Sequence, residues 1–567
     1  MSSPTTPISF RNPIIPGFNP DPSIIRVRGD YFLVTSTFEY FPGIPIYHST
    51  DLLNWKVIGH VLTRREQLDM RTTEPSGGIW APTIRYRTEG KRDSAGNEKG
   101  RFYVSVGCTQ RFRPREWDIV IPRGFYVTTD DIWAPGAWSE PVYFDVPGID
   151  QDLFFDSNGK TYLSAVNQIV QPGIDKHALG LATFTVEIDL ATGRCLSKPA
   201  WNCISQHGIG IAEGPHIFQH DGYYYLSTAE GGTDEGHQQW IRRSKVGPLG
   251  PWEEPNASEG LNVNPVIFNG DDEEIRCTGH LDFVENGNGD WFAVFLGVRV
   301  VDGRLSALGR ETFLAPVQWR DGWPLVNGGA RIGLEMEMAA ASPSLSAHDA
   351  PIKQDIRTSW RDDFDSPELQ LGWYHLRTPL KREYSLTENP GNLSLYGNAY
   401  RIYDSECPSM LLRKQREVSV DWRVGVRFDP ENPLEEAGTA IWWSQFAYAS
   451  IGLRRSVSGE GVEVFFRGYN GKAEGDLFEE NIHPLQSNTE IQLLIRARPT
   501  KYELLFSPSD SDDFTKLGEI SSAALTVRHP GRESPNTGAH FAIYAQGAYA
   551  MPCLQPAVFS FAEWRAV

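Results

Sequence analysis

Short runs of apolar, β-branched and aromatic residues, separated by Gly, Asp and Asn, recur along almost the whole chain. Long stretches with helical periodicity are nearly absent. Runs of this kind are typical of β-strands joined by tight turns. The pattern therefore predicts an all-β protein.

A repeat occurs within this pattern in the N-terminal part of the chain. Each copy is a glycine followed closely by aromatic residues that open an apolar strand, and a shorter apolar strand precedes the glycine. The five copies lie 59 to 71 residues apart and begin at Gly29, Gly100, Gly159, Gly222 and Gly289. Five units of this length, with about four strands each, predict a five-bladed β-propeller. The strand before each glycine should lie innermost, against the central channel.

The repeat ends after Trp323, and a different pattern follows. Residues 339–359 are small and polar and contain proline, which is typical of a linker. From Trp360 onward the chain is again rich in predicted strands, and about two hundred residues of this kind fit one β-sandwich. The predicted organisation is a propeller over 1–338, a linker over 339–359 and a concanavalin-like β-sandwich over 360–567.

The charge of the chain excludes some classes of partner. It carries 53 basic and 72 acidic side chains, a net charge of −19. A nucleic-acid-binding protein needs clustered Lys and Arg, so no nucleic acid is expected. No apolar run is long enough to span a membrane. The N-terminus lacks the basic and apolar parts of a signal peptide, which favours a cytoplasmic location unless a secretion signal was removed before residue 1.

The chain is rich in aromatic residues and poor in cysteine. Its 17 Trp, 21 Tyr and 29 Phe offer flat faces that suit the C–H faces of sugar rings, although strands also collect aromatic residues because these pack well on pleated sheets. The six cysteines show no C-x-x-C spacing. We therefore expect reduced, mostly buried thiols rather than a zinc site or a disulfide framework.

Ionisable residues recur at the same place in four of the five repeats. Asp21, Asp150, Glu213 and His280 each precede their repeat glycine by eight or nine residues. In the second repeat, Trp80-Ala81-Pro82 precedes the inner strand in the same way. Because inner strands converge on the propeller axis, these side chains should meet at one end of the channel. Asx turns at strand starts are the alternative for any single aspartate, but they explain a match across four repeats poorly.

Three carboxylates and an imidazole in one confined place favour a catalytic site. Like charges at short range push pKa values apart, so one carboxyl group stays protonated while its neighbour stays ionised. Glycoside hydrolysis needs this division, with an acid to protonate the leaving oxygen and a base to activate water.

Seven motifs, in order, resemble those of glycoside hydrolase family 43. They are Asn19–Ser23 (NPDPS), Thr35–Gly43 (TSTFEYFPG), Gly77–Pro82 (GGIWAP), Gly148–Asp150 (GID), Glu213–His216 (EGPH), Gly279-His280 and Leu308–Glu311 (LGRE). Their order is similar to that of the β-xylosidase-like branch, and Asp363-Phe364 resembles the start of that branch's C-terminal sandwich. The resemblance covers nearly the whole chain.

The resemblance implies a role for each carboxylate. Asp21 would be the general base that activates water, and Glu213 would be the general acid. Asp150 would orient Glu213 and keep its pKa high. Because the family inverts the anomeric configuration, the carboxyl groups of Asp21 and Glu213 should lie about 6.5–9.5 Å apart rather than the ~5 Å of a retaining pair.

The resemblance also implies five substrate contacts. Arg310 would hydrogen-bond sugar hydroxyls, with a structural ion pair as the alternative, and Phe38 and Trp80 would form an apolar wall, with core packing as the alternative. His280 would lie on the axis, where the family often holds water or a calcium ion, and a structural imidazole is an equal alternative. No other cofactor is expected. Tyr549, from the sandwich, would close the pocket.

We therefore predict an exo-acting, inverting β-1,4-xylosidase that acts on xylo-oligosaccharides. An α-L-arabinofuranosidase acting on arabinoxylan or arabino-oligosaccharides is the close alternative, because both substrates present a terminal pentose. A carbohydrate-binding protein without catalysis is the alternative of another class, but it would not need three carboxylates at the axis. A retaining, fructan-cleaving propeller enzyme would carry a WMNDPNG-like motif, which is missing. An oligomer is compatible with the sequence.

Overall fold

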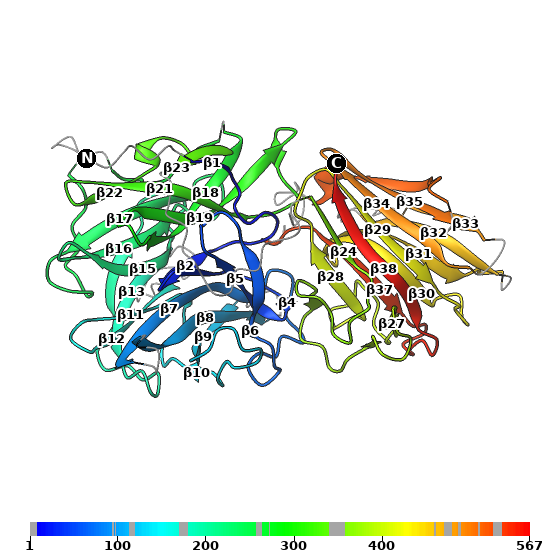
Figure 1. Cartoon of the computed structure of the whole chain (residues 1–567), viewed down its shortest axis with the longest axis horizontal. Coiled ribbons are helices and arrows are strands. Elements are labelled where there is room, and N and C mark those ends of the chain that lie inside the picture. Colours follow the sequence, from blue (N-terminus) through cyan, green and yellow to red (C-terminus); the bar gives the residue numbers. More distant parts are fainter. Residues whose placement is uncertain are drawn as a thin grey trace.

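The computed structural model contains two β-rich lobes (Figure 1). Among the residues that it describes, 38 strands and two short 3-10 helices occur, and no α-helix. This confirms the all-β prediction. The described residues are 8–92, 96, 98–112, 119–168, 180–256, 263–271, 273–338, 358–458, 461–469, 479–485, 489–508, 511–525 and 536–567.

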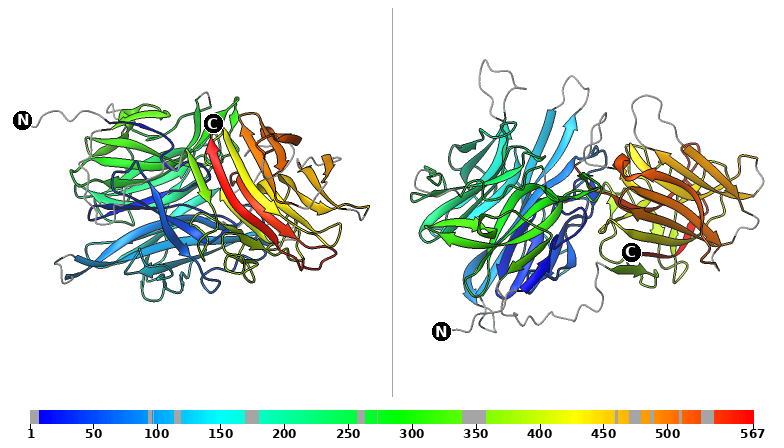
Figure 2. Two further views of the ribbon diagram at one scale, coloured as in Figure 1. Left: turned by 45° about the vertical axis from the view of Figure 1, so that its right-hand side comes forward. Right: turned by 90° about the horizontal axis from the view of Figure 1, so that it is seen from above.

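The N-terminal lobe contains five antiparallel sheets, seen from three sides in Figures 1 and 2. In chain order they are β2 (Ser23–Val27), β3 (Asp30–Val34), β5 (Gly43–Ser49) and β6 (Lys56–Leu62); β7 (Gly78–Arg92), β8 (Glu98–Phe112), β9 (Ile119–Thr129) and β10 (Val142–Tyr143); β11 (Ile149–Phe155), β12 (Thr161–Gln168), β13 (Leu181–Ile188) and β14 (Ala200–Ile204); β15 (Ala212–His220), β16 (Tyr223–Glu230) and β17 (Gln238–Ser244); and β18 (Ile275–Glu285), β19 (Trp291–Val301), β20 (Arg304–Leu305), β21 (Glu311–Arg320) and β22 (Trp323–Val326).

The first strand of each sheet lies innermost. Strand β2 contacts β7, β7 contacts β11, β11 contacts β15, β15 contacts β18, and β18 returns to β2, which closes the ring. This is the propeller that the repeat predicts. Gly159, Gly222 and Gly289 lie in the turns between first and second strands, each with a positive φ of 75° to 87°. Glycine adopts this conformation at little steric cost, which explains why it marks the repeat.

The two ends of the propeller region meet in a small extra sheet. Strand β1 (Ile8–Arg11) pairs with β23 (Glu335–Met338), just beyond β22 and the 3-10 helix η3 (Asn327–Gly329). Of the predicted linker 339–359, residues 339–357 lie outside the described part of the chain.

The C-terminal lobe is a β-sandwich, as predicted. Its two sheets enclose an apolar core in which the rings of Trp422 and Phe541 stack 5.1 Å apart. One sheet consists of β24 (Ser359–Asp362), β26 (Tyr384–Ser385), β27 (Leu393–Leu395), β38 (Ala557–Ala566), β29 (Val420–Arg427), β34 (Ile491–Arg498), β35 (Lys501–Pro508) and β36 (Thr515–Ser521), which leads into η4 (Ser522–Leu525). The other consists of β28 (Met410–Lys414), β37 (His540–Gln546), β30 (Glu436–Ser444), β31 (Ala447–Arg455), β32 (Val462–Tyr469) and β33 (Glu479–Pro484).

The two lobes share a strand pair and an apolar core. Strand β4 (Tyr40–Phe41) of the propeller region pairs with β25 (His375–Leu376), which leads into the sandwich. Phe18 and Tyr40 from one lobe pack in the same cluster as Trp442 from the other. The interface is therefore built like a protein interior rather than like a surface contact.

The state of the cysteines agrees with the sequence, and the helices were also compared with the requirements of a membrane span. All six cysteines are free thiols, and five of them are buried. Within the described residues, no helix combines the length and apolar character needed to cross a bilayer.

Candidate active site

The inner strands share one local distortion at the end where the predicted site residues lie. The pairing register shifts between Trp80 and Thr83, between Ile149 and Asp152, between Glu213 and His216, and between Gly279 and Asp282. Bulges of this kind are frequent next to active sites, where they redirect side chains.

Each distortion contains one residue with a positive φ. The angle is 43° at Ala81, 56° at Asp150, 55° at Gly214 and 53° at His280, and Asp21 has 54° just before β2. Residues with a Cβ adopt this conformation at a cost of about 1–3 kcal/mol and keep it only where the surroundings hold it. The same positive φ recurs in five blades, and in four of them it falls on a residue with a Cβ, a kind of backbone strain that clusters at functional sites.

The sequence count is wrong by one residue in the fourth blade. Gly214 holds the place that Asp21, Asp150 and His280 hold in their blades, and Glu213 comes one position earlier. A Cβ at Gly214 would lie 3.0 Å from the ring of His280, so a side chain here would force the ring to shift. The Gly214 amide donates a hydrogen bond of 2.8 Å to Oδ2 of Asp150. Asp150 therefore holds the peptide that follows Glu213.

A cavity of about 130 Å³ at this end brings together seven of the eight predicted site residues. They are Asp21, Phe38, Trp80, Asp150, Glu213, His280 and Arg310, joined by Ala81, Ile149, Leu181, Thr233, His237, Leu296 and Asn536. Hollows of about 460 and 500 Å³ elsewhere are larger, but neither gathers three carboxylates. Chemistry rather than size distinguishes this cavity.

Asp21 is buried and surrounded by groups that favour its ionised form. Its Oδ2 accepts a hydrogen bond of 2.5 Å from Ser36 Oγ, and its Oδ1 accepts one of 3.2 Å from Nη1 of Arg310. Burial alone would raise the pKa of Asp21, but Arg310, His280 and Ser36 outweigh it and hold the pKa below its usual value. Asp21 is therefore a carboxylate at neutral pH.

Glu213 has the opposite character. Burial, reinforced by the charges of Asp150 and Asp21, raises the pKa of Glu213 to about 8. Burial also raises the pKa of Asp150, with the Gly214 amide opposing the shift and Asp21 adding to it. Glu213 therefore keeps its proton near neutral pH, beside an ionised Asp21.

Arg310 and two aromatic rings form the remaining wall. Besides Asp21, the guanidinium donates to Thr233 Oγ1 at 3.0 Å and to the carbonyl oxygen of Asn536 at 3.4 Å. Its central carbon lies 5.5 Å from the ring centroid of Phe38. Phe38 is buried in the core shared by the lobes and also lines the cavity, and Trp80 is half-buried beside it, with ring centroids 5.9 Å apart.

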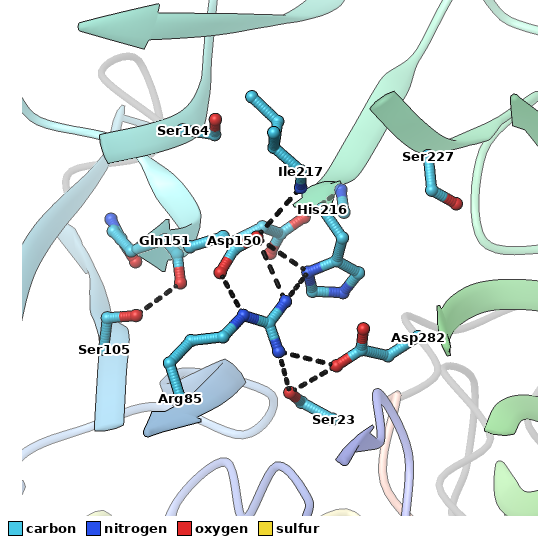
Figure 3. Close-up of polar contacts among 12 residues, drawn as sticks. Ser23, Arg85, Ser105, Asp150, Gln151, Ser164, His216, Ile217, Ser227 and Asp282 are labelled. Atoms are coloured by element: carbon cyan, nitrogen blue, oxygen red, sulfur yellow. Dashed lines mark hydrogen bonds and ion pairs between the residues drawn. The ribbon is translucent and has the colours of Figure 1, made fainter. Parts of the chain in front are cut away.

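A second layer of charges lies two residues further along the same inner strands (Figure 3). Arg85 forms ion pairs of 2.9 Å with both Asp152 and Asp282, and Nη2 lies 3.2 Å from Nδ1 of His216. Ser23 Oγ also donates to Asp282 at 2.7 Å. Two carboxylates at the axis therefore share one guanidinium.

The described residues on the axis offer few direct oxygen ligands for a calcium ion. Calcium takes six to eight oxygen ligands, but here the carboxylates of Asp152 and Asp282 are already matched by Arg85. No group of three His, Cys, Asp or Glu suited to a metal occurs within the described ranges. His280 packs against Gly214 and lies 6.0 Å from the ring of His216, and burial lowers its pKa to about 3. This packing accords with a structural, neutral imidazole.

Tyr549 does not close the cavity as predicted. It is 75% exposed and lies in a separate hollow with Tyr403, Glu436 and Arg467. The sandwich contributes Asn536 instead. Its backbone amide donates a hydrogen bond of 2.6 Å to Ser76 Oγ, and its backbone carbonyl oxygen accepts one from Arg310.

The sequence count missed Ser36, Thr233, His237 and Asn536. In an antiparallel hairpin, the end of the second strand lies beside the start of the first, so residues just after β3 and β16 reach the same end of the channel as Asp21 and Glu213. Applying the repeat to second-strand ends would have found Ser36 and Thr233. His237 lies just before β17, the third strand of its blade, where the count was not applied. Asn536 follows no repeat, and nothing in its local sequence points to the site.

A small cavity in which one carboxyl group is ionised and another protonated, with an arginine paired to the ionised one, has the equipment of a glycoside hydrolase. The comparison with protein families gives the particular class. The chain belongs to glycoside hydrolase family 43: the model for glycosyl hydrolases family 43 matches residues 10–324, and the model for the β-xylosidase C-terminal concanavalin A-like domain matches residues 361–565. The family resemblance stated from the motifs is confirmed.

Relatives with known names are similar to most of the chain. A non-reducing end α-L-arabinofuranosidase of Bacteroides ovatus is 39% identical over 440 residues, which cover 76% of this chain and 73% of that protein. A xylan 1,3-β-xylosidase of a Vibrio species is 33% identical over 80% of this chain and 81% of that protein. The crystal structure of a xylan β-1,4-xylosidase from Bacillus halodurans superposes with a TM-score of 0.82 at 27% identity, covering 98% of this chain and all of that one.

Proposed function

We propose that the protein is an exo-acting, inverting glycosidase that releases terminal pentoses, with β-1,4-linked xylo-oligosaccharides as its substrate. The observation that carries this proposal is the division of protonation states in one cavity, with Asp21 ionised and Glu213 protonated. The small volume of that cavity supports the release of single terminal sugars. Two of the relatives described above are named as xylosidases.

In this proposal each carboxyl group has one task. Asp21 removes a proton from a water molecule as the water attacks the anomeric carbon. Glu213 gives its proton to the glycosidic oxygen as that bond breaks, so the product has the inverted configuration. Asp150 positions Glu213 through the Gly214 amide, and Arg310 keeps Asp21 ionised and offers hydrogen bonds to the sugar.

A second candidate substrate is an α-L-arabinofuranoside. It is favoured by the relative from Bacteroides ovatus, which shows the higher identity and is named for that activity. Both sugars are terminal pentoses, and the same three carboxyl groups would act on either.

The test is hydrolysis of p-nitrophenyl β-D-xylopyranoside and p-nitrophenyl α-L-arabinofuranoside by the wild type and by Glu213→Gln. Glu140→Gln is the control, because Glu140 is an exposed glutamate that pairs with Arg64 and does not line the cavity. We expect release from at least one glycoside, loss in Glu213→Gln and full activity in Glu140→Gln. Proton NMR of the first-formed xylose should show the α-anomer. Equal activity of the two variants would instead support a different site, and no release at all would support a binding protein.

A further inference from the structure

The segment that leads to Asp21 lies against the sandwich. At Gly17 the backbone has a φ of 79°, and a Cβ there would lie 2.4 Å from the carbonyl oxygen of Gln415. The Gly17 amide donates a hydrogen bond of 2.6 Å to Glu311, whose partner Arg299 also reaches Glu417 of the sandwich at 3.3 Å. The approach to the proposed base is therefore built by both lobes.

Asn19 is the centre of this contact, two residues before Asp21. Its amide nitrogen Nδ2 donates to the carbonyl oxygen of Pro16 at 3.1 Å, and its backbone amide donates to that of Arg310 at 2.9 Å. Its side-chain oxygen Oδ1 accepts a hydrogen bond of 2.6 Å from the hydroxyl of Tyr47 and one of 2.8 Å from Nζ of Lys414. Lys414 is the last residue of β28, so this contact joins the sandwich to the segment of the base.

Lys414 is an unusual residue to find there. Its relative exposure is 5%, and Nζ lies 5.6 Å from the ring centroid of Phe18 and 5.2 Å from that of Tyr374. No carboxylate among the described residues forms an ion pair with it. Burial, together with the charge of Arg416, lowers its pKa well below the usual range. A buried amine is costly unless it is hydrogen-bonded, and Asn19 supplies that partner.

We propose that Lys414 is a positioning residue for Asp21, acting through its hydrogen bond to Asn19. Asp21 is held in a left-handed backbone conformation that needs support from its surroundings. Asn19 fixes the preceding backbone to Arg310, just before β21, and to Tyr47 of β5, and Lys414 adds the attachment to the sandwich. The inference rests on the proposed role of Asp21 as the base.

The test compares two substitutions that break this contact with one that does not. Lys414→Met removes the donor, and Lys414→Gln, whose side chain is one bond shorter, breaks the same contact while keeping a polar group. Thr378→Val is the control, because Thr378 is buried at the same interface and donates to the carbonyl oxygen of Leu68 at 2.9 Å, away from Asp21. We expect at least a tenfold loss of kcat in both Lys414 variants, with KM changed less than twofold, and less than a twofold loss in Thr378→Val.

A double-mutant cycle with Asn19→Ala separates positioning from general destabilisation. If Lys414 acts through Asn19, Lys414→Met adds little to the loss of kcat already caused by Asn19→Ala. The inference is overturned if the two losses multiply, if the effect appears in KM alone, or if both Lys414 variants match Thr378→Val. Asp21→Asn is assayed beside them: an active Asp21→Asn overturns the proposed base itself, whereas an inactive one with normal Lys414 variants overturns only the role of Lys414.

Discussion

Two layers of acidic residues lie on the propeller axis, two positions apart along the same inner strands. In the inner layer, Asp152 and Asp282 share the guanidinium of Arg85 at 2.9 Å each. In the outer layer, three carboxyl groups face a cavity, and the guanidinium of Arg310 contacts one of them, Asp21.

The two layers differ in how far a guanidinium opposes the effect of burial on the pKa values of their carboxyl groups. Arg85 and the two aspartates stabilise one another in their charged forms, which raises the pKa of Arg85 and lowers that of Asp282. In the outer layer, burial together with the charges of Asp150 and Asp21 leaves Glu213 with its proton. Placing carboxylates on the axis is therefore not enough for catalysis. Burial of several carboxyl groups beside one cavity is what separates their protonation states.

The largest effect is expected from removing the acid of the outer layer. Glu213→Gln keeps the shape of the side chain but cannot give up a proton, so kcat should fall by about 10²–10⁴-fold. Steady-state kinetics on the preferred glycoside measure this loss, and the folding transition should stay where it is in the wild type. A fall of less than tenfold would place the acid elsewhere.

A substitution in the inner layer should lower the stability of the fold rather than change the catalytic steps. Arg85→Met leaves two buried carboxylates without their partner, and breaking a buried pair in this way costs about 3–5 kcal/mol. Urea denaturation followed by tryptophan fluorescence should show a lower midpoint. Arg64→Met, which removes a partner from the exposed Glu140, is the matched control and should shift the midpoint little. An unchanged midpoint in Arg85→Met would show that the two layers do not differ as argued.

The pH dependence tests the proton on Glu213. Because this group acts while protonated, kcat/KM should hold below its raised pKa and fall as the pH rises through about 8. After burial, Asp150 is the largest cause of that raised pKa, so Asp150→Asn should move the fall to lower pH by about one unit. Asp234 contributes less than Asp150 to the raised pKa of Glu213, so Asp234→Asn should move the fall in kcat/KM by a smaller amount. A larger shift in Asp234→Asn than in Asp150→Asn would contradict this order.

The smallest effect is expected at Tyr549. This residue is mostly exposed and lies outside the cavity, so Tyr549→Ala should change kcat/KM by less than about twofold. Ser76→Ala, which removes the hydroxyl that accepts a hydrogen bond from Asn536, should have the larger effect of the two. If Tyr549→Ala proves the more damaging, the sandwich contacts the substrate through a different arrangement.

The sequence predicts the architecture and the three carboxylates well, because both follow from a repeat that can be counted. The count fails where the chain departs from regular pairing. The third and fourth blades share the same bulge, but the fourth has one residue fewer between that bulge and its repeat glycine, so equal counts match Asp150 with Glu213 instead of Gly214. A count of residues also cannot reveal a backbone that changes to positive φ. Tyr549 was placed by resemblance of a short stretch alone, and the structure gives its expected place to Asn536.

The pairing of Arg85 with two aspartates was beyond the sequence for another reason. Arg85 lies inside a strand whose apolar neighbours predict only that it is part of a hairpin. Its partners come from the third and fifth blades, and such long-range choices among many charged residues leave no local signal. The same holds for Lys414 and Asn19, which are separated by 395 positions in the chain.

The strand pair β4–β25 has a consequence for what counts as a unit of this molecule. An unpartnered strand edge and an apolar face are sites of aggregation, and cutting the chain between the lobes would create both on each piece. The sandwich is thus not a module that can be exchanged or discarded. We expect a shortened chain that ends before β24 to aggregate rather than to act as a smaller enzyme.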